Sequence, residues 1–395
     1  MAQKLYYEQP TLKEWTTSIV DIQEIDGLYH IKLEDSAFYP ESGGQPSDSG
    51  TIDGIELIEC IDHDTEVIHV LREKPKKDTV KCVIDWDRRL DHMQHHSGQH
   101  LLSAAIIELY DIPTISFHLG KDTVTIDLDT PSLTSNQLIQ IELAVYQKII
   151  ENNEIKTYFV KKDQLHTLNL RKLPKVNDED IRIVEITDID VSACCGTHVK
   201  QTGEIGLLKL LKTEKARQST RLHFKCGNRA LLEFQKTNQI VSSVNLIFNT
   251  NSDQLKDKIE QTIYELKEAQ KEIDRLKALI FDSISNECLV KTKNGIIFQS
   301  FTEEDMKDLQ LLTKIIQNKQ PSIIIFTSLK DNRLLFLNQT GSDLHCGNVL
   351  KNILSQIDGK GGGNAQQAQA TFDSSSKLKE ATNLLLHNLE YEIEE

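Results

Sequence analysis

Two short segments of this chain each carry a pair of metal-binding side chains separated by three residues. The first pair is His96 and His100, and the second is Cys194 and His198. An α-helix has about 3.6 residues per turn, so His96 and His100 would lie on one face and could bind one ion. Thiolate and imidazole together favour Zn²⁺ over Mg²⁺ or Ca²⁺. The spacing therefore predicts a tetrahedral Zn²⁺ site formed by these four residues.

Two further histidines in the first segment, His92 and His95, compete as ligands. His92 shares a helix face with His96, but a site built on that pair would leave His100 without a role. We therefore prefer His96 and His100. The segment itself is predicted to be a helix over residues 86–110, because its apolar residues form one stripe at helical spacing. The stripe consists of Leu90, Met93, Leu101, Ala104 and Ile107.

Residues 1–85, before this helix, show short alternating apolar runs with turn signals between them, which is typical of a small β-barrel-like domain. A loop within it places Gly43 and Gly44 between two prolines. Glycines in such a loop let backbone N–H groups approach a ligand closely. The polar residues Ser36, Gln45 and Asp48 surround this pair of glycines.

Residues 86–240 are predicted to form a zinc-containing α+β domain around the metal. Its expected elements are the helix at 86–110, a strand at 123–128, a helix at 137–151 with Ser135 or Asn136 as N-cap, and a strand at 181–186. One ligand pair then lies on a helix and the other follows a strand.

Residues 241–282 carry a heptad-like apolar repeat, which predicts a long helical or coiled-coil connector. Residues 283–395 are predicted to form a C-terminal α/β domain with strands at 322–328 and 333–337 and helices near 350–357 and 375–389. The glycine-rich run at 359–370 is predicted to be a flexible loop. It lacks the Gly-Lys-Ser/Thr ending of a phosphate-binding P-loop.

The formal net charge of −15 argues against a general nucleic-acid binder. One segment differs, because Lys209 to Arg229 carries seven basic residues against the acid Glu214. This basic strip beside the metal motif could receive a polyanion, or it could be a solvated face. The seven cysteines, the absence of a signal-peptide core and the absence of an apolar run near ~20 residues lead us to expect a cytoplasmic protein that does not span a membrane.

Taken together, these motifs resemble the alanyl-tRNA editing proteins, which are free-standing relatives of the alanyl-tRNA synthetase editing domain. The resemblance is carried by the loop at 38–48, His96-x-x-x-His100-Leu-Leu, Cys194-x-Gly-Thr-His198, Thr202-Gly-Glu-Ile-Gly206 and the segment at 221–230. The long helix and the tail beginning at Gly361 are similar to the C-terminal region of the synthetase. The resemblance thus covers nearly the whole chain, as in the long form of the family.

This resemblance implies a zinc-dependent hydrolase that deacylates mischarged alanine tRNA, chiefly the seryl ester and in some cases the glycyl ester. It maps the zinc ligands onto the four residues named above. Ser36, Gln45 and His118 become the candidate catalytic residues, with Ser36 sensing the serine side chain. His118 stands where the synthetase domain has a functional glutamine. The candidate substrate-binding residues are Gly43, Gly44, Lys215, Arg217 and Arg221.

The expected partner is alanine tRNA carrying the wrong amino acid, and a homodimer through the 252–280 helix and the C-terminal domain is a further expectation. The alternative is a non-catalytic, zinc-stabilised tRNA-binding or assembly protein. That reading is kept open by the acidic net charge and by departures from the family pattern at Ser42, Cys195 and His118. A zinc peptidase is disfavoured because the chain has no His-Glu-x-x-His motif.

Overall fold

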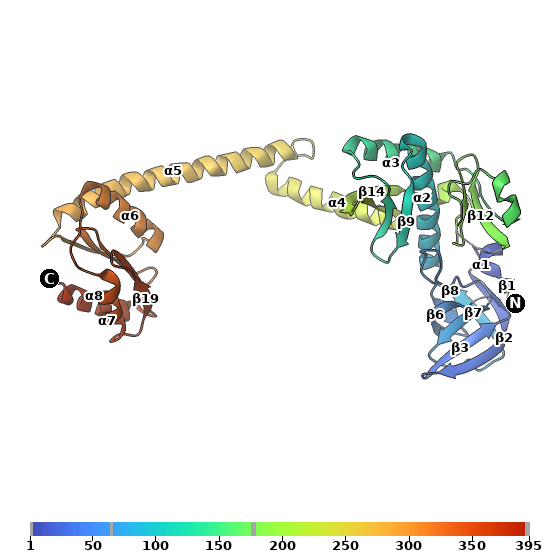
Figure 1. The fold of residues 1–395 in the computed structure, drawn as a ribbon, viewed down its shortest axis with the longest axis horizontal. Coiled ribbons are helices and arrows are strands. Elements are labelled where there is room, and N and C mark those ends of the chain that lie inside the picture. The colour runs from blue at the N-terminus through green and yellow to red at the C-terminus, as the bar shows by residue number, and fades with distance from the viewer. Residues whose placement is uncertain (1–2, 64–65, 175–178, 392–395) are drawn as a thin grey trace. The chain divides into compact units, whose positions relative to one another are not determined.

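The computed structural model describes residues 3–63, 66–174 and 179–391 and divides into two compact units, Met1–Val244 and Asn245–Glu395 (Figure 1). Both units combine helices with β-sheets, so the predicted mixed α+β class is confirmed. The first unit contains all four predicted metal ligands.

Six strands at the start of the first unit close into a barrel in the order β2-β3-β7-β6-β5-β8. Two of its hairpins turn at Asp-Gly pairs, Asp26-Gly27 and Asp53-Gly54, and all four of these residues have positive φ. This is the turn chemistry that a tight hairpin requires. The barrel strands are β2 (Glu14–Ile25), β3 (Leu28–Leu33), β5 (Gly50–Ile52), β6 (Ile55–His63), β7 (Glu66–Leu71) and β8 (Thr79–Ile84). Beside them lie β1 (Gln3–Lys4), α1 (Leu5–Glu8) and β4 (Asp35–Ser36).

The helix that carries the first ligand pair, α2 (Trp86–Tyr110), has the predicted bounds. The Asp85 side chain caps its N-terminus by accepting a hydrogen bond from the Arg88 N–H. A second helix, α3 (Ser135–Ile150), is capped by Thr134 rather than by the predicted Ser135 or Asn136. Thr134 forms a capping box with Gln137, whose side chain bonds back to the Thr134 N–H.

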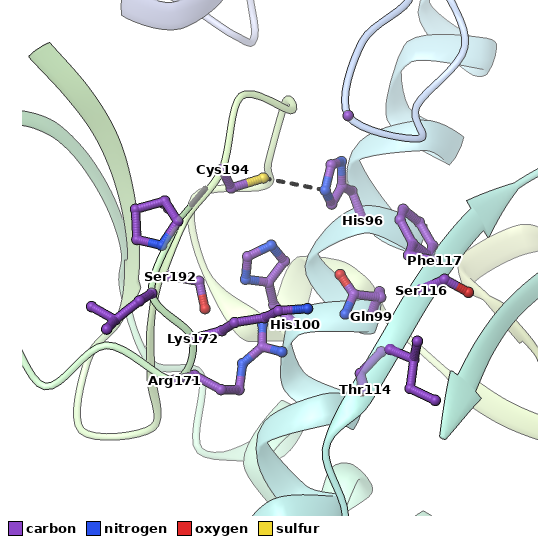
Figure 2. Close-up of a pocket in the computed structure, with 15 residues that line it drawn as sticks. His96, Gln99, His100, Thr114, Ser116, Phe117, Arg171, Lys172, Ser192 and Cys194 are labelled. Atoms are coloured by element: carbon purple, nitrogen blue, oxygen red, sulfur yellow. Dashed lines mark hydrogen bonds between the residues drawn. The ribbon is translucent and has the colours of Figure 1, made fainter. Parts of the chain in front are cut away.

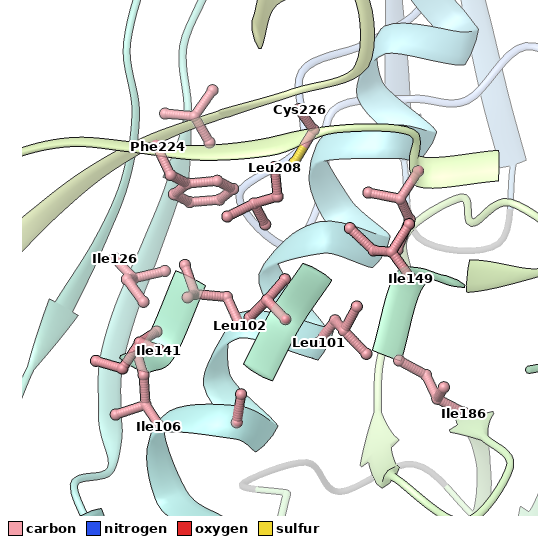
Figure 3. Packing of buried hydrophobic residues seen from close by; sticks show 14 of the residues in the cluster. Leu101, Leu102, Ile106, Ile126, Ile141, Ile149, Ile186, Leu208, Phe224 and Cys226 are labelled. Carbon is pink, nitrogen blue, oxygen red and sulfur yellow. The ribbon is translucent and has the colours of Figure 1, made fainter. Parts of the chain in front are cut away.

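Two sheets pack with these helices. The first has the order β14-β15-β10-β9, and the second has the order β11-β12-β13. Their strands are β9 (Thr114–Leu119), β10 (Val124–Leu128), β11 (Ile155–Lys161), β12 (Asp180–Ile186), β13 (Asp190–Ala193), β14 (Leu208–Ala216) and β15 (Ser219–Cys226), with 3-10 turns at Lys162–Thr167 and Thr202–Ile205. Figure 3 shows the shared core, in which Leu101 and Leu102 of α2 pack among Ile141 of α3, Ile126 of β10 and Phe224 of β15. This core fixes α2, and with it the histidine pair.

The predicted single connector over 241–282 is two helices, α4 (Gly227–Phe248) and α5 (Leu255–Val290). The break falls at Asn249, whose φ of 48° is left-handed, and the following Thr-Asn-Ser-Asp residues are weak helix formers. No helix in the part of the chain that the structure describes is both long enough and apolar enough to cross a bilayer.

The second unit contains a five-stranded mixed sheet in the order β16-β17-β18-β20-β19. Neighbouring residues of one strand face different cores: Ile324 packs in a cluster with α6, and Ile325 packs in a cluster with α7 and α8. Helices therefore cover both faces of this sheet. Its elements are β16 (Ile296–Phe301), α6 (Met306–Lys319), β17 (Ile323–Ser328), β18 (Arg333–Asn338), α7 (Cys346–Leu354), β19 (Lys360–Gly363), β20 (Gln367–Thr371) and α8 (Ser375–Asn388).

The glycine-rich run is not the flexible loop that the sequence predicted, because β19 and β20 pair as an antiparallel hairpin. A Cβ on Gly361 would lie 2.3 Å from the Gln369 carbonyl oxygen, and one on Gly363 would lie 2.1 Å from the Gln367 carbonyl oxygen. The glycines here allow close approach of two strands rather than flexibility.

Candidate metal centre

Four side chains from two distant parts of the first unit converge on one point. His96 and His100 come from successive turns of α2, and Cys194 and His198 come from the segment that follows β13. One ligand atom of each lies within 4.8 Å of all the others. Cys194 Sγ is 3.3 Å from His96 Nε2 and 3.4 Å from His198 Nε2. The structure thus brings together the four residues predicted from their spacing, with the thiolate–imidazole donor set that suits zinc.

Gln45 orients His96. The Gln45 Oε1 atom lies 2.9 Å from His96 Nδ1 and also accepts the Thr197 N–H at 3.1 Å, while Gln45 Nε2 donates to Thr197 Oγ1 at 2.9 Å. Because a carbonyl oxygen only accepts, His96 carries its proton on Nδ1 and presents the Nε2 lone pair to the cluster. Such outer partners fix the ring and the tautomer of metal-binding histidines. Gln45 is fully buried, and its contacts position His96, while the predicted catalytic role of Gln45 stays a prediction.

The other two histidines are held in the same way. His100 Nδ1 lies 3.0 Å from Asp190 Oδ2, and Arg171 Nε donates to Asp190 Oδ1 at 2.7 Å. Burial would raise the pKa of Asp190, but hydrogen bonds and charge from His100 and Arg171 lower it to about 2. His198 Nδ1 lies 3.0 Å from Ser97 Oγ. Each imidazole therefore has a partner on its far nitrogen, and each Nε2 is left for an ion.

Cys194 is prepared as a thiolate. Burial alone raises the pKa of a thiol, but the imidazoles of His96, His198 and His100 hold the Cys194 pKa well below its usual range. Gly196, two residues after Cys194, packs against the His96 ring. Glycine is required at this position, because a Cβ on Gly196 would lie 2.1 Å from His96 Cε1. In the Gly-Thr-His part of the motif, Gly196 is thus needed for steric reasons, and His198 is a candidate metal ligand.

His92 and His95 are not part of the cluster. His95 Nε2 accepts the Cys226 N–H at 2.9 Å, and its Nδ1 lies 2.8 Å from the Asp91 carbonyl oxygen, so this ring ties α2 to the end of β15. His92 is buried, and burial lowers its pKa to about 3. The preference for His96 and His100 is thus supported by geometry.

A cleft of about 440 Å³ opens beside the cluster and is lined by three of the four ligands, His96, His100 and Cys194 (Figure 2). In Figure 2, β9 lies on one side of the histidines, and the segment with Arg171 and Lys172 lies on the other. The remaining lining residues are Gly43, Gln99, Thr114, Ile115, Ser116, Phe117, Leu173, Pro174, Ser192 and Ala193. A volume of this size is typical of a small-molecule site.

One wall of the cleft carries a short chain of polar side chains. Gln99 Nε2 donates to Ser103 Oγ at 2.8 Å, and Ser103 Oγ lies 2.7 Å from Thr114 Oγ1. Gln99 and Thr114, the two ends of this chain, both line the cleft. They can offer hydrogen bonds to a ligand next to the metal ligands.

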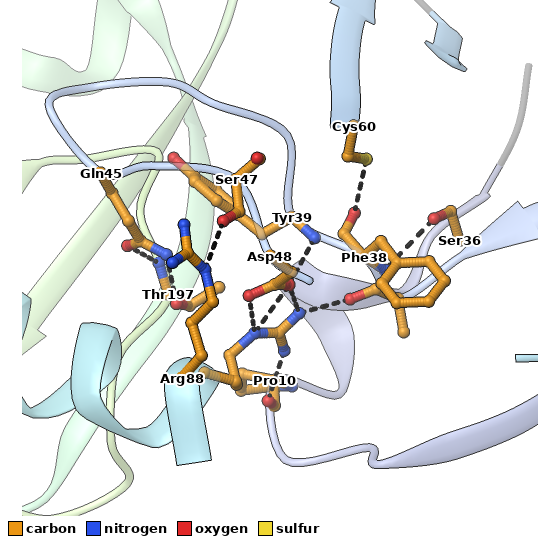
Figure 4. A network of polar contacts seen from close by, with 12 residues as sticks. Pro10, Ser36, Phe38, Tyr39, Gln45, Ser47, Asp48, Cys60, Arg88 and Thr197 are labelled. Carbon is orange, nitrogen blue, oxygen red and sulfur yellow. Dashed lines mark hydrogen bonds and ion pairs between the residues drawn. The ribbon is translucent and has the colours of Figure 1, made fainter. Parts of the chain in front are cut away.

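The Gly43-Gly44 loop reaches the cleft from the barrel. Gly43 lines it, and Gly44 has a φ of 81° and packs so closely on β9 that a Cβ would lie 3.0 Å from the Phe117 carbonyl oxygen. Figure 4 shows the network around Asp48 that anchors the loop. The fully buried Arg89 forms an ion pair with Asp48, and its guanidinium also donates hydrogen bonds to the main-chain carbonyl oxygens of Pro10 and Ala37. This anchor holds the loop, and therefore Gln45, against α2.

Two predicted catalytic residues lie elsewhere. Ser36 is buried inside the barrel region, where its Oγ lies 2.8 Å from His69 Nε2, and it does not line the cleft. His118 is exposed on β9 and pairs with Thr125 of β10, whereas its neighbour Phe117 packs on the His96 ring at 5.2 Å between centroids. The strand alternates its side chains, so Phe117 reaches the metal cluster and His118 is turned away from it.

The basic strip is largely neutralised. Five of its seven basic residues form ion pairs with acids: Lys209 with Glu142, Lys212 with Glu214, Arg221 with Asp127, Lys225 with Glu233 and Arg229 with Asp91. Lys215 and Arg217 have no ion pair among the described residues. Neither lines the cleft. The two basic residues without an ion pair among the described residues lie near the end of β14 and in the turn that follows it.

Asp190, Ser97 and Arg171 support the ligands but were not singled out from the sequence. Ser97 follows His96 directly, so a search for hydroxyl groups next to ligands would have found it. Asp190 and Arg171 are 90 and 71 residues from His100 in sequence, respectively, and no spacing rule connects them. Only the packing of β13 against α2 reveals their role.

Comparisons with known proteins show what this chain is similar to. The threonyl and alanyl tRNA synthetase second additional domain matches residues 181–223, and the DHHA1 domain matches residues 293–390. The alanyl-tRNA editing protein AlaX-L of Pyrococcus horikoshii is 31% identical over 98% of each chain. The alanyl-tRNA editing protein Aarsd1 of Danio rerio is 29% identical over 90% of this chain and 88% of the relative.

The alanine–tRNA ligase of Pyrococcus abyssi is 29% identical over 95% of this chain, which spans only 42% of that enzyme. The free-standing editing proteins therefore match in length as well as in sequence, whereas the ligase is much longer. A match along nearly the whole of both chains, together with both domains and the four converging ligands, shows that this chain belongs to the alanyl-tRNA editing protein family.

Proposed function

We propose that this protein removes serine from mischarged alanine tRNA in trans, by hydrolysing the ester that joins the amino acid to the tRNA, with Zn²⁺ held by His96, His100, Cys194 and His198. The observation that carries the proposal is the convergence of these four donors at an open cleft. The names of the relatives support tRNA editing as the activity.

The residues present fit a zinc ion. All three imidazoles have their Nδ1 atoms engaged, the thiol is prepared as a thiolate, and the donor atoms lie within 4.8 Å of one another. When bound, Zn²⁺ supplies a positive charge that can polarise an ester carbonyl or a water molecule. Four protein ligands are typical of structural zinc sites. Access to three of them from the cleft supports a role in handling the substrate.

The polar wall of the cleft gives a basis for choosing serine over alanine. An apolar pocket rejects one extra hydroxyl by only about 10², whereas a site built to hydrogen-bond that hydroxyl discriminates by roughly 10⁴–10⁵. Alanine lacks the hydroxyl and cannot make such a hydrogen bond. Gln99 and Thr114 line the cleft and can bind the serine hydroxyl, so we assign them the sensing role that the resemblance gave to Ser36.

The test is hydrolysis of seryl-, glycyl- and alanyl-tRNA of the alanine type, with zinc measured on the same sample. We expect about one zinc per chain, rapid loss of serine and sparing of alanine. One zinc per chain with no hydrolysis of any ester would leave the non-catalytic tRNA-binding alternative. Equal rates on the seryl and alanyl esters would contradict the proposal that Gln99 and Thr114 form a wall that senses the serine hydroxyl (the sensing wall).

A further inference from the structure

The charge of the cleft differs from that of the whole molecule. The chain has 60 acidic residues and a net charge of −15, yet the described residues that line the cleft include Arg171 and Lys172 and no acid. Arg171 is bound to Asp190, which holds His100. Lys172 is exposed and has no ion pair among the described residues. Among the described residues that line the cleft, Lys172 is therefore a cation without an ion pair.

The same cleft exposes two apolar side chains. Ile115 on β9 is 51% exposed, and Leu173 in the segment between Lys162–Thr167 and β12 is 72% exposed. Two exposed apolar side chains, with a lysine next to one of them in sequence, suit a single-stranded nucleotide, which has a flat base that can be buried against apolar atoms and an anionic phosphate.

The proposed reaction requires that the last nucleotide of the tRNA lie in this cleft. The scissile ester joins the amino acid to the ribose of the last tRNA nucleotide, so an ester at the metal ligands puts that ribose, its base and its phosphate in the outer part of the cleft. The unpaired residues of the basic strip, Lys215 and Arg217, do not line the cleft and cannot serve this phosphate there.

We propose that Lys172, Leu173 and Ile115 form a subsite for the 3′-terminal nucleotide of the tRNA, in which Lys172 binds the phosphate and the two apolar side chains hold the base. This inference rests on the proposed function. The three subsite residues position the substrate, and they are distinct from the metal ligands and from the sensing wall.

The experiment measures binding of an uncharged RNA minihelix of the tRNA acceptor stem to the full chain, by fluorescence anisotropy at several salt concentrations. One minihelix ends in CCA and a second has an abasic 3′-terminal nucleotide. We expect Lys172→Ala to weaken binding about tenfold and to reduce the slope of log affinity against log salt by about 0.7, as for one single-strand phosphate contact. Lys76→Ala, an exposed lysine of the barrel domain, is the matched control and should change neither value.

Leu173→Ala and Ile115→Ala should each weaken binding of the intact minihelix about fivefold. Neither should weaken binding of the abasic minihelix, because the base contact is already lost there. Val20→Ala, which trims a residue that is 67% exposed in the barrel, controls for a general loss of apolar surface. Wild-type affinity and salt slope in Lys172→Ala, or equal losses of Leu173→Ala on both minihelices, would overturn the subsite.

A parallel assay of seryl-tRNA hydrolysis separates this inference from the proposed function. If the wild type hydrolyses the ester, Lys172→Ala should raise KM about tenfold with kcat kept. If that variant hydrolyses the ester with an unchanged KM, the subsite proposal is wrong and the proposed function stands. If the wild type does not hydrolyse the ester, the proposed function fails, and the minihelix measurements alone decide the subsite.

Discussion

Gln45 is the residue whose substitution best tests how the metal centre is positioned. Gln45→Met keeps the approximate volume but removes the acceptor for the His96 Nδ1–H and both contacts to Thr197. His96 can then rotate or change tautomer. Loss of such an outer partner typically weakens metal affinity 10–100-fold, and we expect that range here, measured by competition with a zinc chelator.

The matched control is Gln23→Met, because Gln23 lies in the barrel strand β2 and its side chain bonds only to Asp21 among the described residues. It should retain wild-type zinc affinity. Unchanged zinc affinity in Gln45→Met would mean that His96 does not depend on Gln45 for its orientation.

Thr114→Val tests the sensing wall. The substitution keeps the shape of the side chain but removes the hydroxyl at the end of the Gln99–Ser103–Thr114 chain. One neutral hydrogen bond contributes a net free energy of roughly 0.5–1.5 kcal/mol, so the rate on seryl-tRNA should fall about 2–10-fold while the slow rate on alanyl-tRNA stays the same. The ratio of the two values of kcat/KM is the quantity to measure.

Ser36→Ala is the comparison for this test. Because Ser36 is buried against His69, its loss should leave the serine-to-alanine ratio unchanged and lower the stability of the first unit. A collapse of the ratio in Ser36→Ala would restore the direct sensing role that the resemblance implied.

The sequence predicted that His96 and His100 share a face, because residues i and i+4 of a helix are neighbours. Cys194 and His198 lie outside any helix, so their part in the candidate site was predicted from residue type and not from helical geometry. The sequence did not predict the partners of those ligands, because Gln45, Asp190 and Ser97 reach the three rings from the barrel loop, β13 and α2. The role of Ser36 could not be judged either, since its distance from the cleft depends on how the barrel closes.

At the scale of elements, the barrel contains a buried histidine that makes its stability depend on pH. His69 Nδ1 lies 3.2 Å from the Ile31 carbonyl oxygen and therefore carries the proton, so Nε2 accepts from Ser36. Burial lowers the pKa of His69 to about 4, compared with about 6.5 in an unfolded chain. The unfolded state therefore binds the proton first. The stability due to neutral His69 is complete above pH ~6.5 and is lost as the pH falls to about 4.

A shift of this size corresponds to roughly 3 kcal/mol across that pH window. His69→Gln should remove this part of the acid sensitivity, so its urea midpoint should fall less than that of the wild type between pH 7.5 and pH 4. His92, whose pKa burial lowers to about 3, titrates in both proteins and cancels in the comparison. An identical pH dependence in the variant would contradict the assignment.

Elements with strong periodicity were predicted well, and elements set by tertiary contact were not. The bounds of α2 follow from its apolar stripe and its Asp85 cap. The β19–β20 hairpin could not be predicted from its glycines, because glycine is needed there for the close approach of a neighbouring strand and not for local flexibility. The break at Asn249 was not predicted, because the apolar residues of α5 follow a helical pattern that gives no sign of a break before it.

At the scale of the whole molecule, the two units have separate cores. The clusters around Leu101 and Phe38 lie in the first unit, and those around Phe336 and Phe326 lie in the second. Several apolar residues of α5 are exposed, among them Leu266 at 70%, and the homodimer through this helix stays a prediction. The metal ligands belong to the first unit alone.

This separation predicts how the molecule responds to loss of its metal. An ion that binds the folded state stabilises the unit that holds it, by an amount that grows with the ratio of free metal to Kd. We therefore expect two unfolding transitions in calorimetry of the zinc-loaded chain, and a chelator should lower only the transition of the first unit. Gly196→Ala should reproduce this shift without chelator, because its Cβ would collide with His96.

Gly362→Ala is the control in the second unit, where a Cβ would meet nothing within 4 Å. It should leave the chelator-sensitive transition unchanged. A single transition that moves as a whole with chelator would show that the two cores unfold together, and the metal centre would then stabilise the entire chain rather than the unit that contains it.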